Sequence, residues 1–201
     1  MHPIERLRYV ARAGSAPDRI LVAEAMPAFS AFARNPGALL VALRQLISRQ
    51  PESPGLLVLG ARVLSALEPI DAGWAFVDEL EADRTNDHAD EMAEHEAGGV
   101  EIIESIASGP DGFLCPPGSA SWIAEGRAAG RTIVVVTPLG SRLPKLLWRG
   151  WLERNGEPST HRPHNDLIPV ADVEEIVGPN GVQPVAAWSS DCSDMPELAS
   201  F

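Results

Sequence analysis

The chain has 201 residues, of which 45% are hydrophobic, and its formal net charge is −12. A chain of this length can bury one substantial core or two small ones. The acidic excess argues against a broad nucleic-acid footprint, which needs clustered Lys and Arg, and it fits a cytoplasmic protein. Charges near the N-terminus interrupt the apolar core that a signal peptide needs, and no run reaches the roughly 18 apolar residues of a membrane span. We therefore expect a protein that binds neither nucleic acid nor a membrane.

The first part of the chain, residues 1–84, predicts a helical bundle. Proline and glycine residues break this segment at short intervals. Between the breaks, apolar residues such as Leu39, Leu43 and Leu46 recur at helical spacing. Helices with short connections are typical of a bundle.

An acidic segment follows at residues 85–99. Its residues are polar, and few of them suit a core. Such a composition indicates a solvated helix, and the glycine pair Gly98-Gly99 indicates flexibility after it. We expect this segment to link two domains.

Residues 100–188 predict an α/β domain. The β-branched run from Thr132 to Val136 follows a small-residue helix that ends at Gly130. A strand that is apolar on both faces is typical of a parallel sheet with helices on both sides. The predicted fold class is therefore α/β: an N-terminal helical bundle followed by a small, truncated Rossmann-like parallel-sheet domain. Residues 189–201 are expected to form a frayed tail.

Four residues form a candidate site for an anionic ligand. Gly118 and Ser119 lie at a predicted helix N-terminus, and Arg142 and Lys145 follow the carboxyl end of the strand at 132–136. Ligands of open α/β sheets tend to lie at such positions, where backbone N–H groups and cations face an anion. The candidate ligand is a sugar phosphate or a nucleotide.

Cys115 is the candidate nucleophile of the chain. It ends a predicted strand just before the helix N-terminus at Gly118, where a thiolate is stabilised. The alternative is a buried Cys that serves as a small hydrophobic residue, because no His or Lys accompanies it in the motif. Cys192 lies far away in sequence, so the two cysteines predict ordinary thiols and no disulfide framework.

Two groups of histidines are candidate metal or anion ligands. His88, Glu91 and His95 have the spacing i, i+3, i+7 and share one face of a helix. Two imidazoles and a carboxylate suit a transition metal, but the polar flanks favour a solvated acidic face. The segment His161-Arg162-Pro163-His164 is either a phosphate or metal loop or an ordinary polar surface loop. We expect no resident cofactor.

Trp148 and Trp151 flank Arg149 on a predicted amphipathic helix. Aromatic residues beside arginine are common anchors of protein interfaces. Core packing is the alternative role of these two tryptophans.

Three segments carry a resemblance to a known family. They are Ser48-Arg49-Gln50-Pro51, Gly109-Pro110-Asp111, and Gly118-Ser119 with its following helix, Gly130 and strand. They resemble motifs of the family that contains the regulatory α, β and δ subunits of translation initiation factor 2B, methylthioribose-1-phosphate isomerase and ribose-1,5-bisphosphate isomerase. The resemblance implies an N-terminal helical domain joined to a C-terminal Rossmann-like domain.

The chain departs from the isomerases of this family. Their catalytic Cys loop, Asn-Thr-Cys-Asn-Thr-Gly, has no counterpart, and the loop of their catalytic Asp is contracted to Cys115-Pro116-Pro117. The first half of the sheet also has no apparent counterpart, which leaves a bare sheet edge that a partner strand would cover. The resemblance thus implies a non-catalytic regulatory or assembly subunit with a protein partner or as a homo-oligomer. The alternatives are an isomerase-like enzyme completed by a partner subunit and a metal-binding module.

Overall fold

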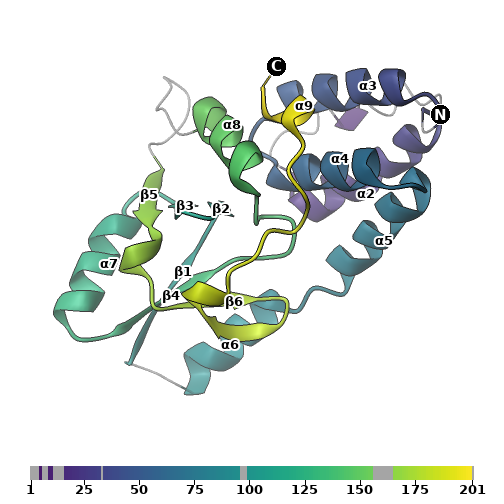
Figure 1. The fold of residues 1–201 in the computed structure, drawn as a ribbon. Helices are drawn as coiled ribbons and strands as arrows, with labels where there is room; N and C mark the ends of the chain where they lie inside the picture. The colour runs from purple at the N-terminus through teal and green to yellow at the C-terminus, as the bar shows by residue number, and fades with distance from the viewer. Residues whose placement is uncertain are drawn as a thin grey trace.

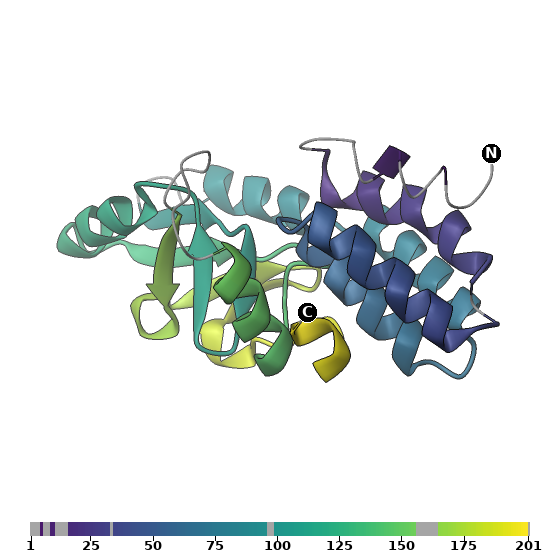
Figure 2. The same ribbon diagram turned by 90° about the horizontal axis from the view of Figure 1, so that it is seen from above.

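The computed structural model describes residues 5, 9–10, 16–32, 34–95, 99–155 and 165–200. A group of helices lies beside an α/β region, and the C-terminal end of the chain runs between the two (Figures 1 and 2). Within the described residues, no helix combines the length and the apolar character that crossing a membrane requires.

The helical region confirms the predicted bundle. Each of its last three helices begins at a proline, a residue whose fixed φ and missing N–H suit the first helical turn. Asn35 and Ser53 cap two of these helices, because their side-chain oxygens accept hydrogen bonds from the amides of Ala38 and Leu56. The helices are α2 (Asp18–Ser30), α3 (Pro36–Arg49), α4 (Pro54–Ser65) and α5 (Pro69–Glu81).

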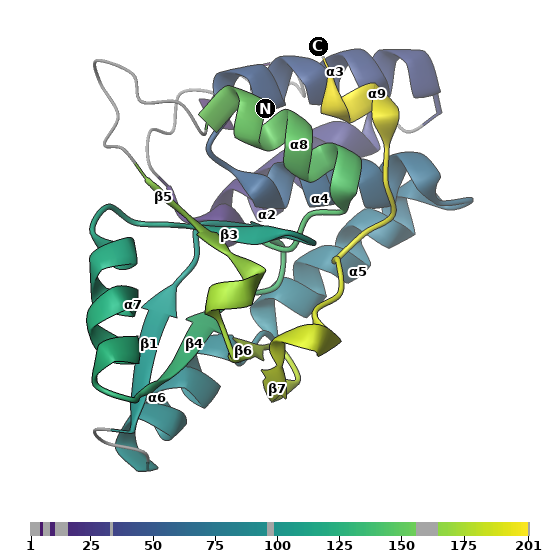
Figure 3. The same ribbon diagram turned by 60° about the vertical axis from the view of Figure 1, so that its left-hand side comes forward.

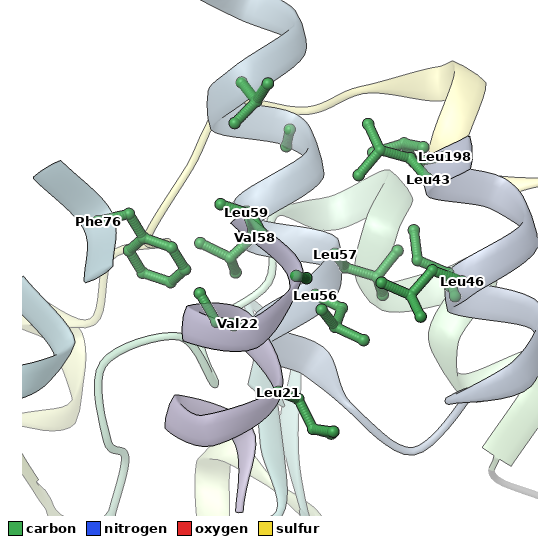
Figure 4. Close-up of a cluster of buried hydrophobic side chains, with 14 of the residues drawn as sticks. Leu21, Val22, Leu43, Leu46, Leu56, Leu57, Val58, Leu59, Phe76 and Leu198 are labelled. Carbon is green, nitrogen blue, oxygen red and sulfur yellow. The ribbon is translucent and has the colours of Figure 1, made fainter. Parts of the chain in front are cut away.

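Helix α4 is the centre of the largest hydrophobic core. Its residues from Pro54 to Ala61 are all buried, which requires neighbours on every side. Leu21 and Val22 of α2, Leu43 and Leu46 of α3 and Phe76 of α5 surround it (Figure 4). The same cluster continues into Leu114, Leu143 and Leu147, so the core crosses the boundary predicted at residue 84.

The α/β region contains the predicted parallel sheet. Its strand order is β1-β4-β6-β7, where β1, β4 and β6 are parallel and β7 is antiparallel to β6. Helices cover both faces (Figure 3): Ile123 of α7 packs with Ile133 and Val135 of β4, whereas Met92 of α6 packs with Val134. The elements are α6 (Thr85–His95), β1 (Val100–Glu104), α7 (Ser119–Ala128), β4 (Thr132–Val136), β6 (Glu175–Gly178) and β7 (Gly181–Pro184).

A second, antiparallel sheet lies between the parallel sheet and the helices. Its strand order is β2-β3-β5, with a tight hairpin between β2 and β3. Its strands are β2 (Ala107–Gly109), β3 (Gly112–Cys115) and β5 (Asp166–Pro169), and helix α8 (Lys145–Asn155) packs on β2. The strand that ends at Cys115 therefore belongs to this small sheet and not to the parallel one.

The acidic segment 85–99 does more than the linker that its composition predicts. Residues Thr85–His95 form helix α6, which packs against all four strands of the parallel sheet. Met92 is buried on Val134 and Val177, and Ala89 packs beside them. Since so few apolar residues make this contact, the acidic composition conceals it.

The frayed tail predicted for residues 189–201 is wrong for the described part. Helix α9 (Pro196–Ala199) packs on α8 and α4, and Leu198 is fully buried against Leu43 and Gly60. Gly60 suits this contact because a Cβ there would lie 2.8 Å from the Leu198 side chain. One leucine in a polar sequence gives no periodic signal, so the pattern misses the contact.

Leu198→Ala tests whether the C-terminal end is part of the core. We expect a loss of about 2–5 kcal/mol in the free energy of unfolding, measured by urea denaturation, because a buried leucine leaves a cavity. Leu67→Ala is the control, since Leu67 is 99% exposed and should change stability by at most about 0.5 kcal/mol. Equal effects of the two changes would contradict the fold.

The start of helix α4 holds a carboxylate from α2. The Gly55 amide donates to Asp18 Oδ2 at 2.6 Å, and the Ser53 side chain also hydrogen-bonds to this carboxyl group. Burial nevertheless raises the pKa of Asp18 to about 6, because removal from water disfavours the charged form more than these bonds favour it.

The raised pKa of Asp18 predicts a pH dependence of stability. In the unfolded chain this carboxyl group titrates near 3.8, so its contribution is fully present below that pH and is lost as the pH rises through 6. We expect the loss to be on the order of 2–3 kcal/mol. Asp18→Asn cannot titrate, so the stability difference between variant and parent, measured by urea denaturation from pH 4 to 7, should shift in favour of the variant as the pH rises. A difference that is independent of pH would refute the assignment.

Candidate functional site

The loop that follows β4, residues 137–144, forms the centre of the candidate site. It leaves the carboxyl end of a parallel strand, where open α/β sheets offer backbone amides to ligands. Gly140 has φ +87°, a conformation that favours glycine, and it turns the loop toward Phe76 and Leu80 of α5. The turn brings its amide and that of Arg142 to one carboxylate of the same chain.

Asp191 supplies that carboxylate. Its Oδ2 accepts hydrogen bonds from the amides of Gly140 (2.7 Å) and Arg142 (3.0 Å). Its Oδ1 accepts from Arg142 Nε (2.8 Å) and lies 2.5 Å from Arg142 Nη2. The Asp191 side chain is fully buried and that of Arg142 is 11% exposed. Burial raises the pKa of Asp191, although the Arg142 guanidinium opposes this shift.

A second carboxylate, that of Asp83, contacts the same loop. The amide of Leu139 donates to Asp83 Oδ2 at 3.0 Å. The other oxygen of Asp83 accepts from the amide and hydroxyl of Thr85 and thereby caps the start of α6. The 137–144 loop is thus held by carboxylates from the α5–α6 connection and from the C-terminal end.

The predicted glycine turn before α7 is also occupied. Gly118 has φ +92° and precedes the helix as expected, and the Ser119 hydroxyl donates to the Pro116 carbonyl at 2.7 Å. The amide of Ala120 donates to Asp166 Oδ2 at 2.9 Å. Asp166, from β5, therefore occupies the helix N-terminus that the sequence offers to a ligand.

Lys145 begins helix α8 and is exposed. At this helix N-terminus, Asp194 Oδ1 accepts hydrogen bonds from the amides of Leu146 (2.9 Å) and Leu147 (3.3 Å). A negative side chain at this position complements the helix dipole.

The four residues predicted to bind a ligand thus fall into three places. Gly118 and Ser119 lie at α7, Arg142 on the 137–144 loop and Lys145 at α8, and at each place a carboxylate of the chain accepts from nearby amides. The aspartates that accept these hydrogen bonds are not among the predicted site residues. Asp191 and Asp194 stand in a short polar run without periodicity, so nothing in the pattern pairs them with the loop or with α8.

Cys115 lacks the surroundings of a reactive thiol. It is fully buried, and burial together with the charge of Asp166 raises the pKa of the thiol to about 12. Such a group stays protonated at physiological pH and serves as a small hydrophobic residue. These surroundings favour the alternative role of Cys115 as a small buried hydrophobic residue, since the Ala120 amide at the start of α7 donates to Asp166.

The metal candidates do not converge. His88 Nδ1 lies 3.3 Å from the Gly178 carbonyl, and His95 Nδ1 lies 2.7 Å from the carbonyl of Glu91 on its own helix. The Glu91 carboxylate is 3.6 Å from Arg84 Nη2. In the part of the chain that the structure describes, no three His, Cys, Asp or Glu side chains form a metal cluster. The segment 161–164 lies outside the described residues.

Trp148 and Trp151 are core residues, which corrects their predicted interface role. Their exposed fractions are 2% and 1%, and their rings stack with centroids 6.0 Å apart. Trp148 Nε1 donates to Asp111 Oδ1 at 2.6 Å, and the ring lies on Gly109, where any Cβ would collide with it. The Gly109-Pro110-Asp111 motif therefore serves to seat a tryptophan.

Comparisons with known proteins show the fold. No protein-family model and no curated protein matches the sequence. The crystal structure of eIF2B beta from Chaetomium thermophilum matches with a TM-score of 0.65 at 11% identity, over 92% of this chain and 88% of that one. The tetrameric eIF2B-beta2-delta2 complex from the same organism matches with a TM-score of 0.65 at 10% identity, over 92% of this chain and 90% of that one.

The likeness confirms the predicted eIF2B-like fold. The matches cover 88% and 90% of the two eIF2B chains, so most of each of those chains has a structural counterpart in this protein. Identity as low as 10–11% carries the fold alone.

The burial of Cys115 and the partial burial of Cys192 predict slow reaction of both thiols with Ellman's reagent. With a pKa of about 12, only a very small fraction of Cys115 and of Cys192 is ionised to the thiolate at pH 8. We expect each to react on the order of a thousandfold more slowly in the folded chain than in urea. Cys115→Ser and Cys192→Ser assign the two rates, and rapid labelling of Cys115 in the folded chain would restore its candidacy as a nucleophile.

Proposed function

We propose that this chain is a non-catalytic regulatory or assembly protein of the cytoplasm that works by binding another protein or a second copy of itself. One observation carries the proposal: the best-placed cation for chemistry, Arg142, is neutralised by Asp191 of the same chain. An enzyme of the resembled isomerase type needs acid and base groups that converge on a substrate. Here the candidate thiol is buried, and burial raises its pKa to about 12.

The fold supports the proposal independently. One of the two matched structures is a tetrameric complex of eIF2B beta and delta, so proteins with this fold assemble. The same fold hosts different functions in different proteins, and the likeness alone therefore supports assembly without naming the partner.

An apolar stripe on α5 is the candidate contact surface. Ile70 and Trp74 are spaced at i and i+4 on the helix and are 38% and 40% exposed, and Leu67, which is 99% exposed, lies in the bend just before the helix. The opposite side of the helix, with Phe76 and Leu80, faces the core. Exposed aromatic and aliphatic side chains at helical spacing are typical of surfaces that bind a partner. We name these three residues the α5 stripe.

The alternative functions have less support. An isomerase-like enzyme and a metal module would each need groups that the structure uses elsewhere, as described above for Cys115 and for His88 and His95. A phosphate-bearing ligand at Gly118, Ser119, Arg142 and Lys145 would compete with Asp166 and Asp191 for the same amides and the Arg142 guanidinium. Protein binding needs none of these groups.

Trp74→Ala tests the α5 stripe, with Trp122→Ala as the matched control. Trp122 is 57% exposed on α7, so the control removes an indole that is more accessible than that of Trp74 from another surface. We expect sedimentation velocity of the purified chain to show self-association, or affinity capture to give a stoichiometric partner. Trp74→Ala should weaken that association about tenfold or more with an unchanged Tm.

Two results would count against different parts of the proposal. A chain that is monomeric at all concentrations and captures no stoichiometric partner overturns the proposed function. An association that Trp74→Ala and Trp122→Ala weaken equally removes the α5 stripe as the surface.

A further inference from the structure

The C-terminal segment, defined here as residues 189–200, makes contacts of the kind that a bound anion makes. Its Asp191 carboxylate presents one oxygen to two loop amides and the other to a guanidinium. Backbone amides at the carboxyl end of a parallel strand, supplemented by arginine, are the groups that hold phosphate or carboxylate ligands in open α/β sheets. The contact set around Asp191 is therefore that of an oxyanion site with its ligand bound.

Asp191 is not the only group that holds the 137–144 loop in its shape. Gly140 takes up its left-handed conformation in contact with Phe76 and Leu80, so α5 supports the loop from outside the segment. Asp83 holds the Leu139 amide at the same time. With these supports we expect the loop amides to stay directed at the same point when the Asp191 carboxylate is removed.

We propose that the C-terminal segment is an internal ligand, in which Asp191 fills an oxyanion-binding site built from the amides of Gly140 and Arg142 and the Arg142 guanidinium. The site takes the carboxylate or phosphate group of a free ligand only when Asp191 is absent. The chain with its segment in place has no vacancy there for a small anion. Because Asp191 fills the site, the conformation of the 137–144 loop does not depend on a bound metabolite.

The C-terminal segment also contacts helices α3 and α4. Arg62 of α4 donates from Nε to the Asp191 carbonyl at 2.9 Å, and its guanidinium lies over the Phe76 ring at 4.5 Å. Arg44 of α3 donates to the Glu197 carbonyl at 2.8 Å. The internal ligand therefore connects the parallel-sheet loop to the helical region, as a ligand between two parts of an enzyme does.

Chemical rescue tests the proposal. Asp191→Ala removes a group that is nearly identical to formate, so formate should bind in its place and stabilise the variant. We expect sodium formate at about ten times its Kd to raise the Tm of Asp191→Ala by about 3–5 °C over sodium chloride of equal ionic strength. The parent chain and Asp191→Asn should show no such rise, because the side chain fills the site.

Two further arms define the site. Asp194→Ala is a matched control from the same segment: Asp194 is exposed and caps α8, so formate should not rescue its loss. Inorganic phosphate replaces formate in a parallel titration, since a rise with phosphate shows that the site also admits a tetrahedral oxyanion. If neither anion stabilises Asp191→Ala more than chloride does, the oxyanion site does not exist and the proposal is overturned.

Hydrogen exchange of the parent chain keeps the proposal testable if Asp191→Ala does not fold. An internal ligand dissociates locally, so the amides of Gly140 and Arg142 should exchange at a lower free energy than global unfolding. Exchange of both amides through global unfolding alone, at the same rate as the amides of β4, would show that the segment is an inseparable part of the core and would overturn the proposal.

Discussion

The buried ion pair between Arg142 and Asp191 joins the helical region, the loop after strand β4 and the C-terminal segment. Burial of two charges costs several kcal/mol each, and that cost is offset only when geometry and additional hydrogen bonds are good. Here both carboxylate oxygens are satisfied, and the amides of Gly140 and Arg142 add two donors to the guanidinium. Because Arg62 of α4 binds the Asp191 carbonyl, the pair also ties the helical region to the parallel sheet. Loss of Asp191 leaves the Arg142 guanidinium without its carboxylate, and loss of the Arg142 side chain leaves the buried carboxylate with the two amides alone.

The acidic composition of the chain acquires a structural explanation from the same principle. Asp18, Asp83, Asp166 and Asp194 each accept from a backbone amide at or beside a helix start, at α4, α6, α7 and α8. Free N–H groups at helix N-termini need acceptors, and carboxylates also complement the helix dipole. Part of the net charge of −12 is therefore engaged in hydrogen bonds that connect elements.

The sequence predicted those elements whose cause is local. The run Thr132–Val136 forms the parallel strand β4, because β-branched residues on both faces leave few alternatives. The helical bundle followed from proline punctuation and leucine spacing, and both are visible within a few residues. The candidate site failed for the opposite reason. Asp191 lies 49 residues from Arg142, and a polar residue gives no sign of its distant partner. Trp148 and Trp151 were ambiguous for a similar reason, since an aromatic stripe is equally suited to a core and to an interface.

At Gly109 and Asp111, resemblance to a family motif does not imply a catalytic role. These residues resemble a family motif, and the fold agrees with that family at a TM-score of 0.65. In this structure, however, Gly109 gives the Trp148 ring its place and Asp111 accepts from the indole N–H. The packing of Gly109 and the hydrogen bond of Asp111 give both residues a structural role in this chain that needs no substrate. Agreement in such residues therefore indicates the fold, and only groups left unengaged by the fold indicate a reaction. Asp191 binds the Arg142 guanidinium and the amides beside it, so these groups are not available to another molecule. A function of this chain must therefore be argued from groups that the fold leaves unengaged.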